Sequence, residues 1–418
     1  MDSKTHNTRT LWLCTVLHGF THVYHLALIP LYLLIRKDFS LTSDGQATFL
    51  VTAMGVSYFL PSYFMGILAD RVSRKKLLAL GLTINAAGFV GLAFAPNYAT
   101  AVACLIVAGF GGSFYHPAAT ALIARLFPEN TGKALGKVGI GASLGFFVGP
   151  IYSGWRAESA GWRQPILELG IIGLIGAAAF VWLAVEHENP KPLARPDKKV
   201  RLFPTPLFWI LFLFASFAFC LRDFAGMGVG TLSSLFLQRA HGFTLVQTGL
   251  TLSCLYLASV ISNPLFGGLS DRGRTRWTSA VLIIAAIIIF IIPHLRGSWI
   301  PFALASYGFF FMASYPMVEA ALMESVPDAV RGRVFGLFIT IGGLLGNFSH
   351  WLIGIWTKNL GTHASEPSAY FNLYNVLAAC VIVSLAGLFG LHHLRRKEGR
   401  DKMKGEFDPA TVSSPQFE

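Results

Sequence analysis

Residues 66–76 read GILADRVSRKK, and residues 267–274 read GGLSDRGR. Each stretch follows a long apolar segment, and their aspartates, Asp70 and Asp271, are 201 residues apart. Two other pairs of motifs repeat at 199 to 201 residues: Tyr115-His116-Pro117 with Ser314-Tyr315-Pro316, and GKALG at 132–136 with GRVFG at 332–336. A recurring spacing of this kind indicates a duplicated structural unit.

The composition excludes a soluble cytosolic protein. Of the 418 residues, 54% are hydrophobic and only 13% are charged, whereas soluble domains carry about 25% charged residues. Twelve apolar stretches are each long enough to cross a bilayer as a helix. They lie near 11–35, 46–68, 77–95, 100–126, 134–157, 165–186, 207–237, 246–269, 277–294, 299–325, 334–357 and 370–394.

These stretches predict an all-α membrane protein of two pseudo-symmetric six-helix bundles. We expect an N-terminal tail at 1–10, a bundle at 11–186, a linker at 187–206, a second bundle at 207–394 and a tail at 395–418. With both termini cytoplasmic, the cytoplasmic segments hold 24 Lys and Arg residues and the external segments hold seven. This bias follows the positive-inside rule. The net charge of +12 is therefore a topology signal, and no nucleic-acid partner is expected.

Other classes of site find little support in the sequence. The five cysteines all lie in apolar stretches, so we expect packing residues rather than disulfides or metal ligands. The sequence lacks G-x-S-x-G, H-E-x-x-H and phosphate-loop motifs, which argues against an enzyme and for a gradient as the energy source. We expect a monomer without a cofactor or resident metal.

The G-x-L-A-D-R-x-S-R-K-K loop resembles the signature between helices 2 and 3 of the major facilitator superfamily. A second motif, Gly145-x-x-x-Gly149-Pro150 with Gly154 in the fifth apolar stretch, resembles the antiporter-associated motif of that superfamily. Together with Gly141 these residues permit close helix contact and a bend, and we call them the helix-bend motif; a pure packing role is the other interpretation. A narrower resemblance, to fosmidomycin-resistance drug exporters, rests on the spacing of His18 and His22, on His116-Pro117 and on Arg222-Asp223-Phe224. His22, Ala118-Ala119 and Lys137 depart from that pattern.

The superfamily resemblance implies a latch between the bundles on the cytoplasmic side, holding the outward-open state. A carboxylate at the end of one helix is attracted to the positive N-terminus of another, so Asp70 is expected near the start of helix 11 and Asp271 near the start of helix 5. Glu186 is a further candidate for this network. The assigned gating residues are Gly66, Asp70, Arg71, Arg74, Arg125, Gly267, Asp271, Arg272 and Glu324; membrane anchoring is the other interpretation for the basic ones.

Ionisable side chains inside a bilayer are expensive and usually mark a pathway. His18, His22 and His25 are spaced i, i+4 and i+7, which places them on one helix face. The resemblance implies that helices 1, 4, 7 and 10 line the cavity. The assigned substrate and proton pathway is His18, His22, His25, Tyr115, His116, Lys137, Arg222, Asp223, Tyr315, Glu319 and His350. For His350 and His25 a structural hydrogen-bonding role competes with this assignment, and for Lys137 a position near the membrane surface.

Because adjacent residues point about 100° apart on a helix, we do not expect Arg222 and Asp223 to form one simple salt bridge. The cavity offers two fixed cations, Lys137 and Arg222, and two carboxylates, Asp223 and Glu319. This set of charges suits a small anionic or zwitterionic substrate. We therefore predict a proton-coupled exporter of such compounds or drugs in the bacterial inner (plasma) membrane, working by alternating access.

Two alternatives stay open. The histidine row of helix 1 also suits a transporter of a transition metal or metal chelate. A non-transporting membrane sensor is the second alternative, although the C-terminal tail is too short to form an output domain.

Overall fold

The computed structural model describes residues 3–69, 71–186, 203, 205–271, 273–326 and 331–395. The first part of the chain forms α1 (Ser3–Ala27), α2 (Tyr32–Asp38), α3 (Asp44–Ala69), α4 (Arg74–Ala93), α5 (Tyr98–Gly112), α6 (Tyr115–Leu126), α7 (Thr131–Ala160) and α8 (Arg163–Leu183). The second part forms α9 (Pro206–Ala240), α10 (Leu245–Leu257), α11 (Ser259–Ser270), α12 (Arg274–Ile291), α13 (Trp299–Met323), α14 (Arg331–Lys358) and α15 (Phe371–Ser384). Short 3₁₀ segments join several of them, including η1 (Ile29–Leu31), and the described residues contain no strand.

Eleven segments of the described chain are long and apolar enough to cross a membrane. They correspond to eleven of the twelve predicted stretches. The twelfth, α13, has sufficient length at 25 residues, but Ser314, Tyr315, Pro316 and Glu319 lower its hydropathy. Many of its side chains, Tyr307, Phe311 and Met317 among them, are buried in the protein, and a helix that lines a site needs less apolar surface than one surrounded by lipid.

Several of the predicted continuous helices are broken. The stretch expected at 100–126 divides into α5 and α6 at Ser113 and Phe114, and the stretch at 246–269 divides into α10 and α11 at Ala258. Pro117 explains the first break, because a proline removes a hydrogen bond to the residue four positions earlier, here Ser113, and its ring clashes with that carbonyl. The break brings Tyr115 and His116 to the first turn of a new helix.

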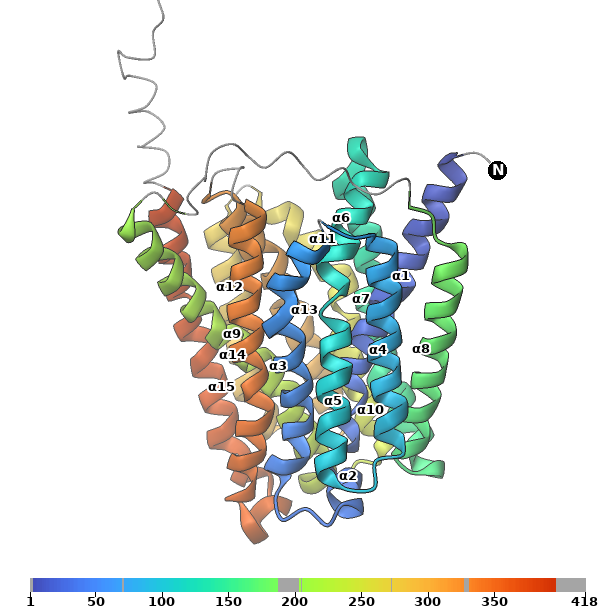
Figure 1. Cartoon of the computed structure of the whole chain (residues 1–418). Helices are drawn as coiled ribbons and strands as arrows, with labels where there is room; N and C mark the ends of the chain where they lie inside the picture. The colour runs from blue at the N-terminus through green and yellow to red at the C-terminus, as the bar shows by residue number, and fades with distance from the viewer. Residues whose placement is uncertain are drawn as a thin grey trace, which may run out of the picture.

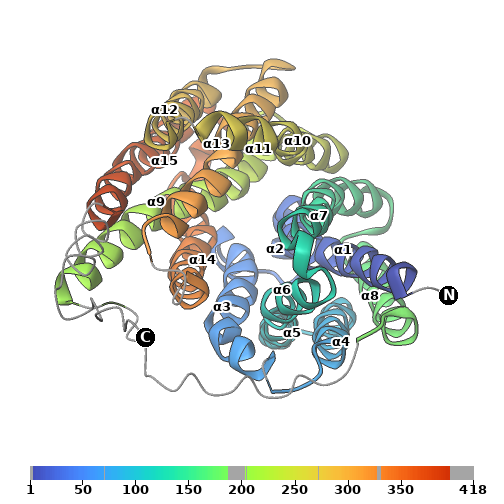
Figure 2. The ribbon, with the colours of Figure 1, turned by 90° about the horizontal axis from the view of Figure 1, so that it is seen from above.

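The helices form two groups (Figures 1 and 2). Helices α1 to α8 gather on one side of the molecule and α9 to α15 on the other, and we refer to these groups as the first half and the second half. Nearly all helices run along the long direction of Figure 1. We call the upper end of that view, where α1 begins, the terminal end, and the lower end the α2 end.

Large apolar side chains cover much of the outer surface. Ile175, Ile210, Ile261, Leu60 and Phe302 are each more than half exposed. Contiguous exposed apolar surface of this kind is rare on soluble monomers. It fits an environment of lipid tails.

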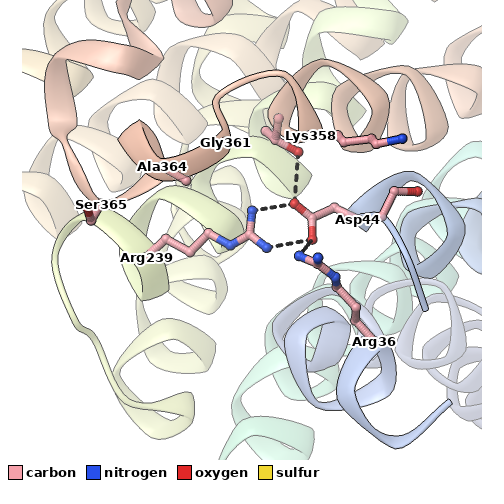
Figure 3. A pocket seen from close by; sticks show the side chains of 9 residues that line it. Arg36, Asp44, Arg239, Lys358, Gly361, Ala364 and Ser365 are labelled. Carbon is pink, nitrogen blue, oxygen red and sulfur yellow. Dashed lines mark hydrogen bonds and ion pairs between the residues drawn. The ribbon is translucent and has the colours of Figure 1, made fainter. Parts of the chain in front are cut away.

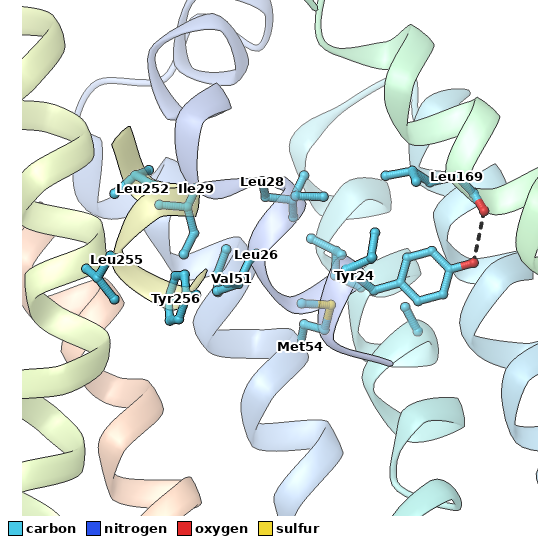
Figure 4. Close-up of a cluster of buried hydrophobic side chains, with 14 of the residues drawn as sticks. Tyr24, Leu26, Leu28, Ile29, Val51, Met54, Leu169, Leu252, Leu255 and Tyr256 are labelled. Atoms are coloured by element: carbon cyan, nitrogen blue, oxygen red, sulfur yellow. Dashed lines mark hydrogen bonds between the residues drawn. The ribbon is translucent and has the colours of Figure 1, made fainter. Parts of the chain in front are cut away.

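Apolar side chains also seal the contact between the halves (Figure 4). Leu26 of α1 and Ile29 of η1 lie beside Leu252 and Leu255 of α10, all of them buried. These buried apolar contacts join η1 and the end of α1 to α10 of the other half.

Helix α7 packs unusually closely on α1 through the glycines of the predicted helix-bend motif. A Cβ atom at Gly141 would lie 1.9 Å from the carbonyl oxygen of Thr15, and one at Gly145 would lie 2.2 Å from that of Gly19. Gly149 approaches Val23 in the same way, at 3.0 Å. Only glycine permits this approach of two backbones.

The end of the same motif contacts the second half. A Cβ at Gly154 would lie 2.4 Å from the carbonyl oxygen of Leu245, and one at Gly249 would lie 2.4 Å from that of Pro150. The motif thus holds α7 against α1 at Gly141, Gly145 and Gly149 and against α10 at Gly154.

We predict that Gly145→Ala lowers the thermal stability of the purified protein in detergent. The added methyl group has to separate α1 from α7, and overpacking of this kind costs about 1–3 kcal/mol. Gly136→Ala on the same helix is the matched control, because nothing lies within 4 Å of its Cβ position. Equal melting temperatures for the two variants would contradict the role assigned to this contact.

Candidate functional site

Three histidine rings meet in the first half. His18 and His22 come from α1, and their Nε2 atoms are 3.2 Å apart. His116, from the first turn of α6, places its ring centroid 5.1 Å from that of His18 and 6.0 Å from that of His22. We call His18, His22 and His116 the histidine cluster. The predicted face of α1 therefore meets the predicted His-Pro pair.

Neighbouring groups fix the orientation of His18. Its Nδ1 atom lies 2.9 Å from the carbonyl oxygen of Val138 in α7, and Tyr115 stacks on its ring at 4.8 Å between centroids. The Tyr115 hydroxyl donates to the carbonyl oxygen of Cys14 at 2.7 Å. Both residues are buried, so His18 has little freedom to turn.

His25 and His350 lie outside this cluster. The Nδ1 atom of His25 lies 2.9 Å from the carbonyl oxygen of Thr21, and its ring meets the edge of Tyr58 at 4.7 Å. His350 of α14 hydrogen-bonds to Thr231 at 2.6 Å, and Thr231 in turn bonds to Tyr32 at 3.2 Å. That chain of hydrogen bonds joins the two halves.

A buried ion pair occupies the second half. Arg222 of α9 donates to Asp223 Oδ1 from Nε at 3.0 Å and from Nη2 at 2.8 Å. The expectation that these neighbours would not pair simply is therefore wrong. The long arginine side chain folds back along the helix far enough to reach the carboxylate of the next residue.

The surroundings of this pair explain why it forms. Asp223 lies against Gly342 and Gly346 of α14, where a Cβ at Gly342 would be 2.5 Å from Oδ2. The Arg222 guanidinium lies over the ring of Tyr315 at 4.1 Å. Arg222 is only 1% exposed, and an unpaired buried charge costs several kcal/mol.

Glu319 lies one helical turn beyond Tyr315 on α13. It is partly buried, and the spacing of four residues places it on the same helix face as Tyr315, whose ring lies under the Arg222 guanidinium. Arg222, Asp223, Tyr315 and Glu319, which we call the ion-pair cluster, thus bring together predicted residues from two helices.

Lys137 does not join either cluster as a buried cation. Its side chain is exposed on α7, while the next residue, Val138, faces His18. Of the two fixed cations predicted for the pathway, Arg222 alone is buried with the ion-pair cluster.

The predicted cytoplasmic latch is only partly described. Asp70 and Arg272 lie outside the described residues. Asp271 is 70% exposed and pairs with Arg274 at 3.1 Å, and the side chains at the start of α7, the predicted helix 5, lie outside the described residues. Glu324 pairs with Arg274 at 2.6 Å and with Arg395 at 3.1 Å, all in the second half.

In the first half, Glu186 accepts hydrogen bonds from the backbone N–H groups of Arg74 and Lys75 at 2.9 and 3.1 Å and from the Ser73 hydroxyl. It therefore caps α4 rather than linking the halves. The side chains of Arg71 and Arg125 are exposed. A Cβ atom at Gly66 would lie 3.8 Å from that of Pro117, whereas a Cβ atom at Gly267 would have no neighbour within 4 Å.

An unpredicted cluster joins the halves at the α2 end (Figure 3). The Asp44 carboxylate at the start of α3 is 1% exposed and accepts from Arg36 Nη1 at 2.8 Å. It also binds both terminal nitrogens of Arg239 in α9, with Nη2 to Oδ1 at 2.6 Å, and accepts from Thr357 of α14 at 3.3 Å. A cavity of about 370 Å³ lies beside it. We call Asp44, Arg36 and Arg239 the α2-end lock.

The sequence contains only a weak indication that Asp44, Arg36 and Arg239 meet. Arg36 and Arg239 count only as external basic residues, and Asp44 stands 195 residues from Arg239. No periodic pattern connects them. The one indication is an aspartate in the first turn of a helix, which is common for helix capping.

The model of the Major Facilitator Superfamily matches residues 11–349. The chain belongs to this superfamily. It is therefore a multi-pass membrane transporter of small molecules rather than an enzyme, and with bacterial relatives of this kind it belongs in the plasma membrane. The superfamily prediction made from the loop motif is confirmed.

Several relatives of this transporter are named for drug resistance. Multi-drug resistance efflux pump PmrA of Streptococcus pneumoniae is 29% identical over 408 residues, which cover 93% of this chain and 96% of the relative. Multidrug resistance protein 2 of Bacillus subtilis is 27% identical over 73% of this chain and 78% of its own length. Quinolone resistance protein NorA of Staphylococcus aureus is 28% identical over 40% of this chain and 41% of NorA.

Solved structures agree on the fold. A bacterial homolog of the human lysosomal transporter Spinster has a TM-score of 0.72 at 18% identity, covering 96% of this chain and 99% of the homolog. The peptide transporter POT in complex with alafosfalin has a TM-score of 0.73 at 14% identity, covering 95% and 99%. The transporter thus has the helical fold of this superfamily.

We predict that Asp44→Asn destabilises the transporter strongly. It leaves Arg36 and Arg239 facing each other without their shared counter-ion, and breaking a buried ion pair costs about 3–5 kcal/mol. Asp38→Asn is the control at the same end, since Asp38 is 41% exposed and pairs with Arg163; exposed pairs contribute about 0–1 kcal/mol. Thermal unfolding in detergent checks the difference, and a smaller effect of Asp44→Asn than of Asp38→Asn would contradict it.

Proposed function

We propose that this transporter exports small zwitterionic or anionic organic compounds, including drugs, in exchange for protons. The observation that carries the proposal is the buried Arg222–Asp223 pair with Tyr315 and Glu319 beside it. Ionisable groups at this depth in a membrane are retained for transport or proton transfer. The drug efflux relatives support the direction of transport.

The charges of the ion-pair cluster favour a zwitterion among these substrates. Arg222 presents a cation to an anionic group of the substrate, whereas Glu319 presents a carboxylate to a cationic group. Because Lys137 lies outside the cluster, a substrate with only negative charges would meet one buried cation and two carboxylates. A compound with both charges meets a partner for each.

Proton coupling follows from competition for Arg222. In this proposal, a proton on Glu319 leaves Arg222 to pair with Asp223 alone; the two hydrogen bonds from Arg222 to Asp223 support that state. Loss of that proton adds a second negative charge beside the same guanidinium. The pair then rearranges or accepts a cationic group of the substrate. A proton on Glu319 and a bound cationic group therefore exclude each other at this site.

Alternating access between the halves is the proposed motion. At the α2 end the halves are joined by the α2-end lock and by side-chain-to-backbone hydrogen bonds, such as the one that Ser234 Oγ donates to Ile29 O at 2.7 Å. At the terminal end Asp271, Glu324 and Glu186 bind groups of their own half. We propose that the terminal end is cytoplasmic and that this structure is closed toward the outside.

The coupling is tested in proteoliposomes with an imposed pH gradient and a fluorescent fluoroquinolone, which is zwitterionic at neutral pH. We expect the wild type to move the drug against its gradient, and Glu319→Gln and Asp223→Asn each to lose most of the gradient-driven flux. Glu168→Gln is the control, because this carboxylate pairs with Arg156 at 2.9 Å away from the cluster. Flux that ignores the pH gradient, or that survives removal of both carboxylates, would refute proton coupling.

The motion is tested with a single cysteine at the joint. Ser234→Cys in a variant without the five native cysteines places a thiol where Ser234 meets Ile29. A membrane-impermeant maleimide added outside cells is expected to label it slowly, and several-fold faster when Asp44→Asn removes the α2-end lock. Equal labelling in both backgrounds, with both proteins monodisperse, would mean that the lock does not hold this end closed.

A further inference from the structure

The histidine cluster contains more ligand chemistry than the proposed proton exchange uses. The side chains of His18, His22 and His116 each offer a ring nitrogen, and these three atoms all lie within 4.8 Å of one another. We propose that the three histidines form a binding site for a divalent transition-metal ion. The proposal is independent of drug export, because it concerns binding at groups outside the ion-pair cluster.

The tautomer of His18 prepares it as a ligand. A ring nitrogen that faces a carbonyl oxygen must carry the hydrogen, so His18 donates from Nδ1 to Val138 O at 2.9 Å. Its Nε2 atom is then unprotonated and presents a lone pair toward His22. Metal-binding histidines usually have their second nitrogen held by a carbonyl or carboxylate in this way.

The distances fit a small ion. Zinc binds imidazole nitrogen at about 2.0–2.1 Å, which places two ligand atoms of a tetrahedral site about 3.3 Å apart. The Nε2 atoms of His18 and His22 are 3.2 Å apart. In the metal-free protein this contact is a hydrogen bond donated by His22, and the ion replaces that hydrogen when His22 takes its other tautomer.

His116 completes the set from a second helix. It stands at the first turn of α6, directly after the break at Ser113 and Phe114. An approach of about 1.5 Å brings it to the ligand distance of zinc. A side-chain rotation at an exposed residue suffices for that movement.

The sequence alone favoured His25 as the third ligand of this row, and the geometry selects His116 instead. The ring centroid of His25 is 6.2 Å from that of His22, and its Nδ1 faces Thr21 O. His25 therefore serves as a matched control on the same helix.

The donor set defines the class of metal. Imidazole nitrogens suit zinc, copper, nickel and cobalt, whereas calcium and magnesium need oxygen ligands. Three histidines leave a fourth position on a tetrahedral ion open. That position is available to water or to an anionic group of a bound compound.

Binding is tested by titrating Co²⁺ into the full-length transporter, purified in detergent without a polyhistidine tag, and recording visible absorption. We expect one equivalent to produce the intense bands of a four-coordinate site, and Zn²⁺ to remove them by displacement. His22→Gln and His116→Gln are each expected to weaken binding at least about tenfold. His25→Gln is expected to bind as the wild type does.

Thermal unfolding and gel filtration of each variant establish that it is folded, and Cu²⁺ electron paramagnetic resonance of the wild type counts the coordinated nitrogens independently. Absence of Co²⁺ bands and of coordinated nitrogens in the wild type would overturn the proposal. So would equal affinities of His116→Gln and His25→Gln. Neither result affects the flux measurements that test proton-coupled export.

Discussion

Helix α7 lies within backbone contact of two neighbours, α1 in its own half and α10 in the other, and the candidate sites depend on this arrangement. The glycines at 141, 145 and 149 bring α1 so close that the Val138 carbonyl reaches His18. Farther along, Phe146 contacts His22 at 4.1 Å between centroids and stacks on Tyr256 of α10 at 5.1 Å. Two aromatic rings, those of Phe146 and Tyr256, therefore connect the histidine cluster with the second half.

Two buried ion-pair groups lie inside the apolar body. Arg222 has Asp223 and the Tyr315 ring, and Asp44 has two arginines and a threonine. In a lipid environment an unpaired charge is costly enough to exclude a stable fold. Each pair is thus both a structural requirement and a group that a proton or a substrate can displace.

Much of the fold was predictable because the membrane imposes strong constraints on sequence. Spans, the half-repeat and the common face of His18 and His22 follow from hydropathy, internal spacing and helical periodicity. The contacts that cross between helices were not predictable in this way. Nothing in the order of residues 44 and 239 shows that Asp44 meets Arg239, and periodicity gave the wrong answer for Arg222 and Asp223, because it fixes Cα directions and not the path of a long side chain.

The two ends of the molecule differ in what their carboxylates bind, and this difference bears on how the halves move. Asp44 binds arginines from both halves at once, so separating the halves at the α2 end exposes a carboxylate and two guanidinium groups together. Asp271, Glu324 and Glu186 keep their partners whichever way the halves tilt, since those partners belong to the same half. In the proposed cycle, opening the α2 end therefore requires a replacement interaction elsewhere. Asp271 is the carboxylate best placed to form this replacement interaction from its position at the end of α11. It is 70% exposed, and it shares its only described partner, Arg274, with Glu324.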